Sequence, residues 1–264
     1  MTSTEAAALL GASPTSVKRW ADSGLLPCVK TAGNHRRFTR EALEAFVHRE
    51  SDVPSQPAGA PDLLEMLLSS GVPAIHGRLL TERAECGSWA EVCDRLGPTI
   101  SAMGSAWADG HISVIDEHVA TGRLTRALAN VAEFVAVAPG APVALLVAAE
   151  GDEHTLGLAL AEVTLREAGW RTLWSGRGTP TELLSDAVHE HEVRLIAVSA
   201  SSYSSDEVTL ARYAAALAEV AREARCELIF GGSGAWPEPL PEGTVIRSFR
   251  AFSDTARLLL RPVG

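Results

Sequence analysis

The C-terminal half of the chain alternates between two kinds of segment, and this alternation is the strongest constraint on its fold. The continuous apolar run VALLVAA at 143–149 is typical of a strand that is buried on both faces of a sheet. A segment with helical spacing follows and ends at Gly169, and the same two segment types then recur up to residue 260. Alternating strands and helices predict a doubly wound parallel sheet, which binds its ligands at the carboxyl ends of the strands.

Two proline-containing breaks, at 51–62 and 138–142, predict a multidomain α + α/β protein. Between them, apolar residues recur every three or four positions, and corner glycines separate four helices. The predicted parts are a winged helix-turn-helix domain at 1–50, a linker at 51–60, a four-helix bundle at 61–138 and a Rossmann-like domain at 141–264. The predicted helices of the bundle span 61–69, 73–86, 88–107 and 111–137.

Charge is unevenly distributed along the 264 residues. The net charge is −10, but residues 1–50 carry seven Lys and Arg against five Asp and Glu, so the remainder is strongly acidic. A basic N-terminal segment followed by an acidic remainder indicates a DNA-binding module joined to a module that does not bind DNA. The longest apolar run is too short to cross a bilayer, no signal peptide is evident, and four scattered cysteines without a CxxC pair indicate reduced thiols. We therefore expect a cytoplasmic protein.

The first fifty residues have the pattern of a DNA reader. Gly11 ends one short helix, and residues 14–22 form the candidate recognition helix. Gly33–Asn34 is a hairpin turn signal, and Thr39 is placed to cap a closing helix. The segments TEAAALLGASPTSVKRWADSGLLP and TAGNHRRFTREALEAF resemble the winged helix-turn-helix of the MerR family over nearly all of 2–47. The candidate DNA-binding residues are Thr15, Lys18, Arg19, His35, Arg36 and Arg37.

The loop after the first predicted strand, EGDEHTLG at 150–157, carries Asp152 and His154. A histidine at a strand end can reach a metal, and a carboxylate two residues earlier can hydrogen-bond the far ring nitrogen and fix the tautomer. A lone histidine before a helix is more often a partner of the helix N-terminus. No histidine or cysteine nearby completes a zinc set, so a single-histidine site needs a metal that brings its own ligands, such as a tetrapyrrole.

Three elements at successive strand ends resemble the cobalamin-binding fold of methionine synthase and the corrinoid-dependent mutases. They are Asp-x-His-x-x-Gly at 152–157, Ser-Ala-Ser at 199–201 and Gly-Gly at 231–232. The resemblance implies that His154 replaces the corrinoid's own base as the lower axial ligand of cobalt. It also implies that the displaced nucleotide tail lies beside Ser199 and the small residues at 231–232. The candidate cofactor-binding residues in this module are Glu150, Asp152, His154, Gly157, Ser199, Ser201, Gly231 and Gly232.

The stretch WADGHISVIDEH at 107–118 places Trp107 ten positions before Glu117 and His118. This spacing resembles the CarH/LitR light-dependent repressors, which join a MerR-like domain, a four-helix bundle and a cobalamin domain in this order. The resemblance implies that the bundle caps the upper face of cobalamin. Trp107 would stack over the 5′-deoxyadenosyl group, while Glu117 and His118 would hydrogen-bond around it. Taken alone, Trp107 also fits core packing.

The resemblance further implies a regulator rather than an enzyme. Its partners would be adenosylcobalamin, operator DNA and further copies of itself, a tetramer in the family, with no membrane and no other protein required. The dark oligomer would bind DNA, and light would break the cobalt–carbon bond and release it. Described members have a cobalt-binding histidine directly after the tryptophan, where this chain has Ala108. A cobalamin sensor with an altered or absent photoresponse therefore stays open, as does a corrinoid carrier of a methyltransferase, against which residues 2–47 argue.

Overall fold

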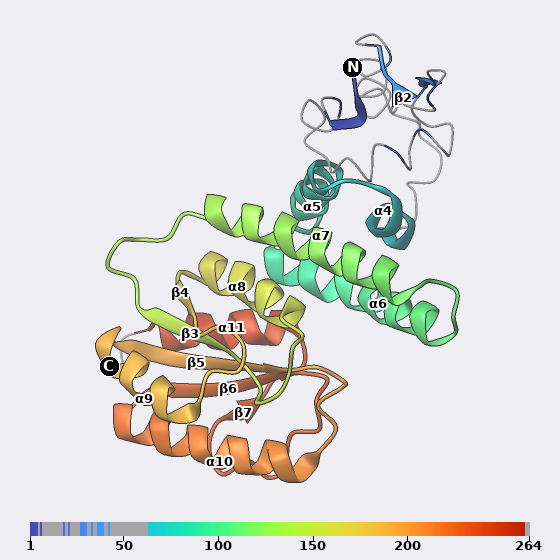
Figure 1. Cartoon of the computed structure of the whole chain (residues 1–264). Helices are drawn as coiled ribbons and strands as arrows, with labels where there is room; N and C mark the ends of the chain where they lie inside the picture. The colour runs from blue at the N-terminus through green and yellow to red at the C-terminus, as the bar shows by residue number, and fades with distance from the viewer. Residues whose placement is uncertain are drawn as a thin grey trace. The chain divides into compact units, whose positions relative to one another are not determined.

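The computed structural model divides the chain into two compact units, residues 1–60 and 61–264 (Figure 1). In the first unit it describes residues 1–4, 6, 18, 21, 27–30, 33, 36–39 and 42, and in the second it describes residues 63–261.

The first unit contains the predicted hairpin. Strand β1 (Val29–Lys30) pairs antiparallel with β2 (Arg36–Arg37), with Gly33 in the turn between them. The Thr39 hydroxyl accepts a hydrogen bond of 3.1 Å from the Ala42 amide, which confirms the predicted cap. Lys18 is helical and exposed. Thr15, Arg19, His35 and most of the predicted recognition helix lie outside the described residues.

The second unit begins with four helices, as predicted: α4 (Leu63–Ser69), α5 (Val72–Cys86), α6 (Trp89–Ala108) and α7 (Val114–Phe134). Helix α6 starts where the Ser88 side chain accepts from the Glu91 amide. Helix α7 starts at a capping box between Ser113 and Asp116, three residues later than predicted, because this cap fixes the first helical turn. The short α6–α7 connection therefore keeps Trp107 close to the start of α7.

A five-stranded parallel sheet follows, in the order β4-β3-β5-β6-β7, which confirms the predicted doubly wound fold. The strands are β3 (Val143–Ala148), β4 (Arg171–Trp174), β5 (Val193–Ala200), β6 (Glu227–Gly232) and β7 (Thr244–Val245). The helices between and after them are α8 (Leu156–Ala168), α9 (Thr181–Glu190), α10 (Glu207–Ala224) and α11 (Phe249–Leu259). Helices α8 and α11 lie on one face of the sheet, and α9 and α10 lie on the other (Figure 1).

The point where strand order reverses lies between β3 and β5. The chain leaves β3 toward α8 on one face and leaves β5 toward α10 on the opposite face (Figure 1). The two loops therefore diverge and open a crevice at the carboxyl ends of these strands, where doubly wound sheets bind their ligands. Asp152 and His154 are in the first of these loops, and Ser201 is in the second.

The four helices pack on α8 and α11 through a shared apolar core. Leu156, Leu160 and Val163 of α8 belong to the same buried cluster as side chains from α4 to α7. Two carboxylates add polar ties: Asp94 of α6 accepts from the Phe249 amide at 2.7 Å, and Glu167 of α8 accepts from the Trp89 amide at 2.8 Å. The start of α6 is thereby tied to α8 and α11. The domain limits at 61–138 and 141–264 remain a prediction.

Within the described residues, none of the helices combines the length and apolar character needed to span a bilayer.

Candidate functional site

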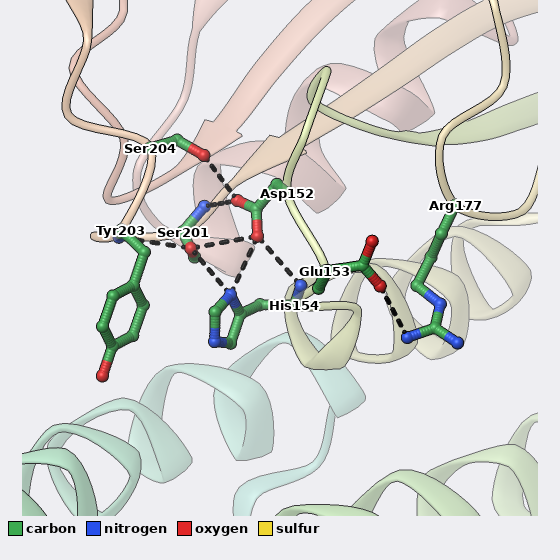
Figure 2. Close-up of polar contacts among 7 residues, drawn as sticks. All are labelled: Asp152, Glu153, His154, Arg177, Ser201, Tyr203 and Ser204. Carbon is green, nitrogen blue, oxygen red and sulfur yellow. Dashed lines mark hydrogen bonds and ion pairs between the residues drawn. The ribbon is translucent and has the colours of Figure 1, made fainter.

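The predicted contact between Asp152 and His154 is present at the carboxyl end of β3 (Figure 2). Asp152 is buried, and its Oδ1 accepts from the His154 amide at 2.9 Å and lies 2.9 Å from His154 Nδ1. In the neutral imidazole, the tautomer that satisfies this carboxylate is the one in which Nδ1–H donates a hydrogen bond to it. The other ring nitrogen, Nε2, then has a free lone pair, which is the form of histidine that binds a metal.

Asp152 is also bound by the loop that follows β5, at Ser201 and Ser204. Its Oδ2 accepts from the Ser201 amide and from the Ser204 hydroxyl at 2.8 Å, and its Oδ1 accepts from the Ser201 hydroxyl at 3.1 Å. Burial alone would favour the neutral acid, but these hydrogen bonds and those from His154 outweigh it and hold the pKa of Asp152 below its ordinary value. Asp152 is therefore a carboxylate at neutral pH, and it joins the two loops of the crevice.

Two aromatic rings, those of Tyr203 and Trp107, lie between this pair and the helices. Tyr203 stacks on His154 with ring centroids 4.6 Å apart and planes inclined by 9°. Trp107, at the end of α6, lies 6.2 Å from Tyr203 between centroids and is tilted by 56°. The predicted sheet side and helical side of the site thus meet through Tyr203. Our sequence prediction missed this residue, although its position directly after a predicted strand was an available signal.

The remaining predicted residues on the helical side are the half-buried Glu117 and the exposed His118. Glu117 accepts from the Thr121 hydroxyl at 2.7 Å, and its other carboxylate oxygen lies 3.6 Å from His118 Nε2. The His118 side chain is 71% exposed. These contacts join neighbours along α7, and the described contacts of Glu117 and His118 do not reach Trp107. Their predicted roles around an upper ligand stay predictions.

Charged residues form the rim of the crevice. Glu150 is exposed and pairs with Arg212 of α10 at 3.3 Å. Glu153 pairs with Arg177 of the loop after β4 at 2.9 Å (Figure 2). Exposed pairs of this kind contribute little to stability, so both glutamates are available to polar groups of a ligand.

A cavity of about 420 Å³ lies beside the crevice, between the sheet edge and helices α6, α8 and α11. Four predicted site residues line it: Gly157, Ser199, Gly231 and Gly232. Phe249 and Phe252 provide an apolar wall.

Two of these glycines lie very close to atoms of the neighbouring strand β5. A side chain at Gly157 would place its Cβ 2.6 Å from Ser199 Oγ, and one at Gly232, where φ is +81°, would lie 2.1 Å from the Ala200 carbonyl oxygen. Because neither residue has a side chain, the cavity on this side is bounded by backbone atoms alone at these two positions. The cavity can therefore accept a flat or elongated group close to the strands.

These features fit a corrinoid better than a bare ion. Across residues 63–261 and the described part of the first unit, no three or more His, Cys, Asp and Glu side chains gather in a group that could hold a metal. A single oriented histidine suits a metal whose other ligands come from a macrocycle. The glycine-lined cavity beside it suits a further arm of the same ligand. The donor set and the cavity thus agree with the predicted cofactor class.

Fold and sequence together define a class of protein: a helix-turn-helix domain followed by a unit with the fold of corrinoid proteins. The family described as Helix-turn-helix domain matches residues 1–51. The monomethylamine corrinoid protein of Methanosarcina barkeri has a similar structure, with a TM-score of 0.55 and 15% identity over 75% of this chain and 96% of that protein. The predicted architecture is therefore confirmed.

Two repressors are similar in sequence. The HTH-type transcriptional repressor CarA of Myxococcus xanthus is 29% identical over 161 residues, 59% of this chain and 54% of CarA. The transcriptional repressor DcmR of Methylorubrum extorquens is 48% identical over 61 residues, 22% of this chain and 23% of DcmR. The matched regions thus span about half of one relative and about a quarter of the other.

Proposed function

We propose that this chain is a transcription regulator that binds operator DNA through residues 1–50 and adenosylcobalamin at the crevice between β3 and β5. The observation that carries the proposal is the Asp152–His154 pair, which presents one imidazole nitrogen at the ligand-binding edge of a corrinoid-protein fold. The similarity to two transcriptional repressors and the helix-turn-helix match support the DNA-binding half. The Asp152–His154 pair supports only the corrinoid site, and the helix-turn-helix match supports only the DNA-binding domain, so the proposal depends on both.

Each part of the site has a distinct proposed task. His154 Nε2 would hold the cobalt, and the hydrogen bond between Nδ1 and Asp152 would fix the ring orientation and the tautomer in which Nε2 is the ligating nitrogen. The cavity lined by Gly157 and Ser199 accepts the nucleotide tail. Trp107 covers the upper side as a flat apolar surface, while Glu117 and His118 offer polar atoms to the adenosyl group.

Adenosylcobalamin, when bound, supplies a cobalt–carbon bond that green light breaks. Trp107 would pack against the bound adenosyl group, so loss of that group would alter the packing between the end of α6 and the β5 loop. In the dark the helices are held in one arrangement that supports an oligomer. Several linked helix-turn-helix domains then bind DNA more tightly than one, because the second contact is made at high effective concentration.

The test uses the full chain reconstituted with adenosylcobalamin in the dark, with operator DNA selected from a random-sequence pool. Absorption spectrum, mass in solution and DNA affinity are measured before and after green light. We expect a larger dark oligomer that binds DNA and a smaller lit species that does not. Unchanged mass and DNA affinity after complete photolysis contradict the light mechanism, and failure to retain the corrinoid contradicts the cofactor assignment.

A matched variant, Arg36→Ala with Arg37→Ala, tests the DNA half separately. These residues form β2 of the hairpin. Their loss should leave corrinoid binding intact while weakening DNA binding, and it should lower the slope of log affinity against log salt by about 2, one for each phosphate contact. An unchanged salt slope would exclude the hairpin from the DNA interface.

A second candidate function is favoured by Ala108, which ends α6 with a methyl side chain that cannot bind a metal. In this case the chain senses cobalamin supply without a full photocycle. DNA binding would then depend on the cofactor but not on illumination. The same experiment separates the two functions, because the sensor keeps its oligomer after photolysis.

A further inference from the structure

Tyr203 lies between the two sides of the candidate site. Its ring is stacked on His154 at 4.6 Å and is 6.2 Å from Trp107 between centroids. In Figure 2 its hydroxyl end extends further toward the helices below than the imidazole does. The space between the predicted lower ligand and the predicted upper cover is thus partly filled by a side chain of the protein itself.

This position conflicts with a macrocycle held by His154. A tetrapyrrole bound through one axial imidazole spreads beyond that ring on every side, because the ligating nitrogen lies on the axis of the macrocycle. A phenol ring stacked 4.6 Å beside the imidazole and extending past it lies within that area. We propose that Tyr203 is a gate: it occupies the corrin-facing space in the cofactor-free chain and rotates away when a corrinoid binds.

The neighbours of Tyr203 allow such a rotation without rearrangement of the loop. Ser201 and Ser204, on either side of it, are both hydrogen-bonded to the buried Asp152 carboxylate. The Tyr203 amide donates to Ser201 Oγ at 3.3 Å, so its backbone is also held. The residue is 59% exposed, so its side chain has room to turn. The gate therefore moves by side-chain rotation, while the contacts that orient His154 persist.

The closed gate has two effects on the cofactor-free protein. It covers one face of the His154 imidazole, and it links the β5 loop to the end of α6 through Trp107. Both contacts must be given up on loading. Aromatic pairs of this kind change an equilibrium by about threefold to tenfold, so removal of the ring should favour corrinoid binding by that factor.

The inference rests on the proposed corrinoid site, and the test compares Tyr203→Ala and Tyr203→Phe with the unmodified chain. Phe134→Ala is the matched control, because Phe134 is an exposed aromatic residue at the far end of α7. Association rate and affinity are followed by absorption with hydroxocobalamin and with cobinamide, which has the macrocycle but lacks the nucleotide tail. We expect Tyr203→Ala to load both corrinoids about threefold to tenfold faster and more tightly, with Tyr203→Phe and Phe134→Ala unchanged.

A second readout needs no corrinoid. In NMR spectra of the cofactor-free chain, the His154 ring protons should shift in Tyr203→Ala, because the ring current of the stacked phenol is lost, but not in Tyr203→Phe. An unshifted His154 signal, or equal or weaker corrinoid binding by Tyr203→Ala, overturns the gate while the proposed function stands. If the unmodified chain and every variant fail to bind both corrinoids, the proposed function is wrong and the gate falls with it.

Discussion

The two sides of the candidate site differ in how completely they are formed. On the sheet side, Asp152 is 4% exposed and accepts hydrogen bonds from three residues in two loops. On the helical side, Trp107 is 36% exposed and the His118 side chain is 71% exposed. The sheet side is thus already organised for a ligand. The helical side is more exposed, and its residues make fewer contacts with the rest of the protein. A switch is expected to combine these properties, because the stable side retains the ligand and the loosely held side responds to it.

The largest effect should follow removal of the metal donor on the sheet side. In His154→Ala the affinity for hydroxocobalamin should fall by at least about a hundredfold, because no other described imidazole approaches this strand end with its second nitrogen held by a buried carboxylate. The fold should be unchanged, since the side chain is half exposed. Isothermal titration and absorption spectra measure the loss. The control is His189→Ala, an exposed histidine on α9, and comparable loss in both variants would contradict the assignment.

The next effect concerns the residue that organises the sheet side. Asp152→Asn should weaken corrinoid binding by about tenfold to a hundredfold, since the imidazole loses its charged partner. At pH 7 it should also lower the free energy of unfolding by about 2 kcal/mol, because several hydrogen bonds to a buried carboxylate are weakened. Calorimetry and urea unfolding measure the two quantities. Glu153→Gln, which alters only an exposed ion pair in the same loop, should change both very little.

The stability effect of Asp152→Asn should depend on pH in a defined direction. The pKa of Asp152 is held below its ordinary value of 3.8 by its hydrogen bonds. Its ionised form therefore stabilises the fold fully above about pH 4, and this contribution is lost as the pH falls through the lowered pKa. The difference in the free energy of unfolding between the parent protein and Asp152→Asn should be constant near neutrality. In urea unfolding at pH 3 this difference should be smaller. A gap that widens in acid would show that the carboxylate is not the stabilising form.

Substitutions of two glycines on the sheet side should distinguish an effect on ligand binding from an effect on stability. In Gly157→Ala the new methyl group meets only the flexible Ser199 hydroxyl, so stability should stay within about 1 kcal/mol of the parent. Affinity for cobalamin should fall about tenfold because the cavity narrows, while affinity for cobinamide, which lacks the tail, should not. Gly232→Ala instead meets a backbone carbonyl at positive φ and should cost about 2 kcal/mol or more in thermal unfolding. Equal losses for both corrinoids in Gly157→Ala would place the tail elsewhere.

The sequence predicted much of the fold because the relevant signals are local. Helical spacing, corner glycines and buried apolar runs determine α4 to α11 and the strands of the sheet. The Asp152–His154 contact was also predictable, since the two residues are two positions apart at a strand end. The ties made by Asp94 to the start of α11 were not, because they join residues 155 and 156 positions apart and depend on how the helices pack.

The contacts between the two sides of the site were not predicted from the sequence. The rings of Tyr203, His154 and Trp107 come from three separate segments, and their meeting depends on the conformation of the β5 loop. Ser204 reaches Asp152 only because that loop turns back over the strand end. Contacts of this kind follow from loop geometry rather than from the periodicity of the sequence. The sequence motifs therefore predicted the residues on the sheet side and on the helical side of the site, but they did not predict Tyr203, which lies between them.

The smallest effect is expected on the helical side and tests the comparison most directly. Trp107→Ala should change the unfolding free energy by no more than about 1 kcal/mol, because the ring is partly exposed at the end of α6. It should reduce affinity for adenosylcobalamin about threefold to tenfold relative to the affinity for hydroxocobalamin, because only the former has an adenosyl group for the indole to cover. Trp107→Phe should restore part of the difference. Equal losses for both corrinoids in competition titrations would mean that Trp107 contacts the macrocycle itself, and the helical side would then hold the cofactor as firmly as the sheet side does.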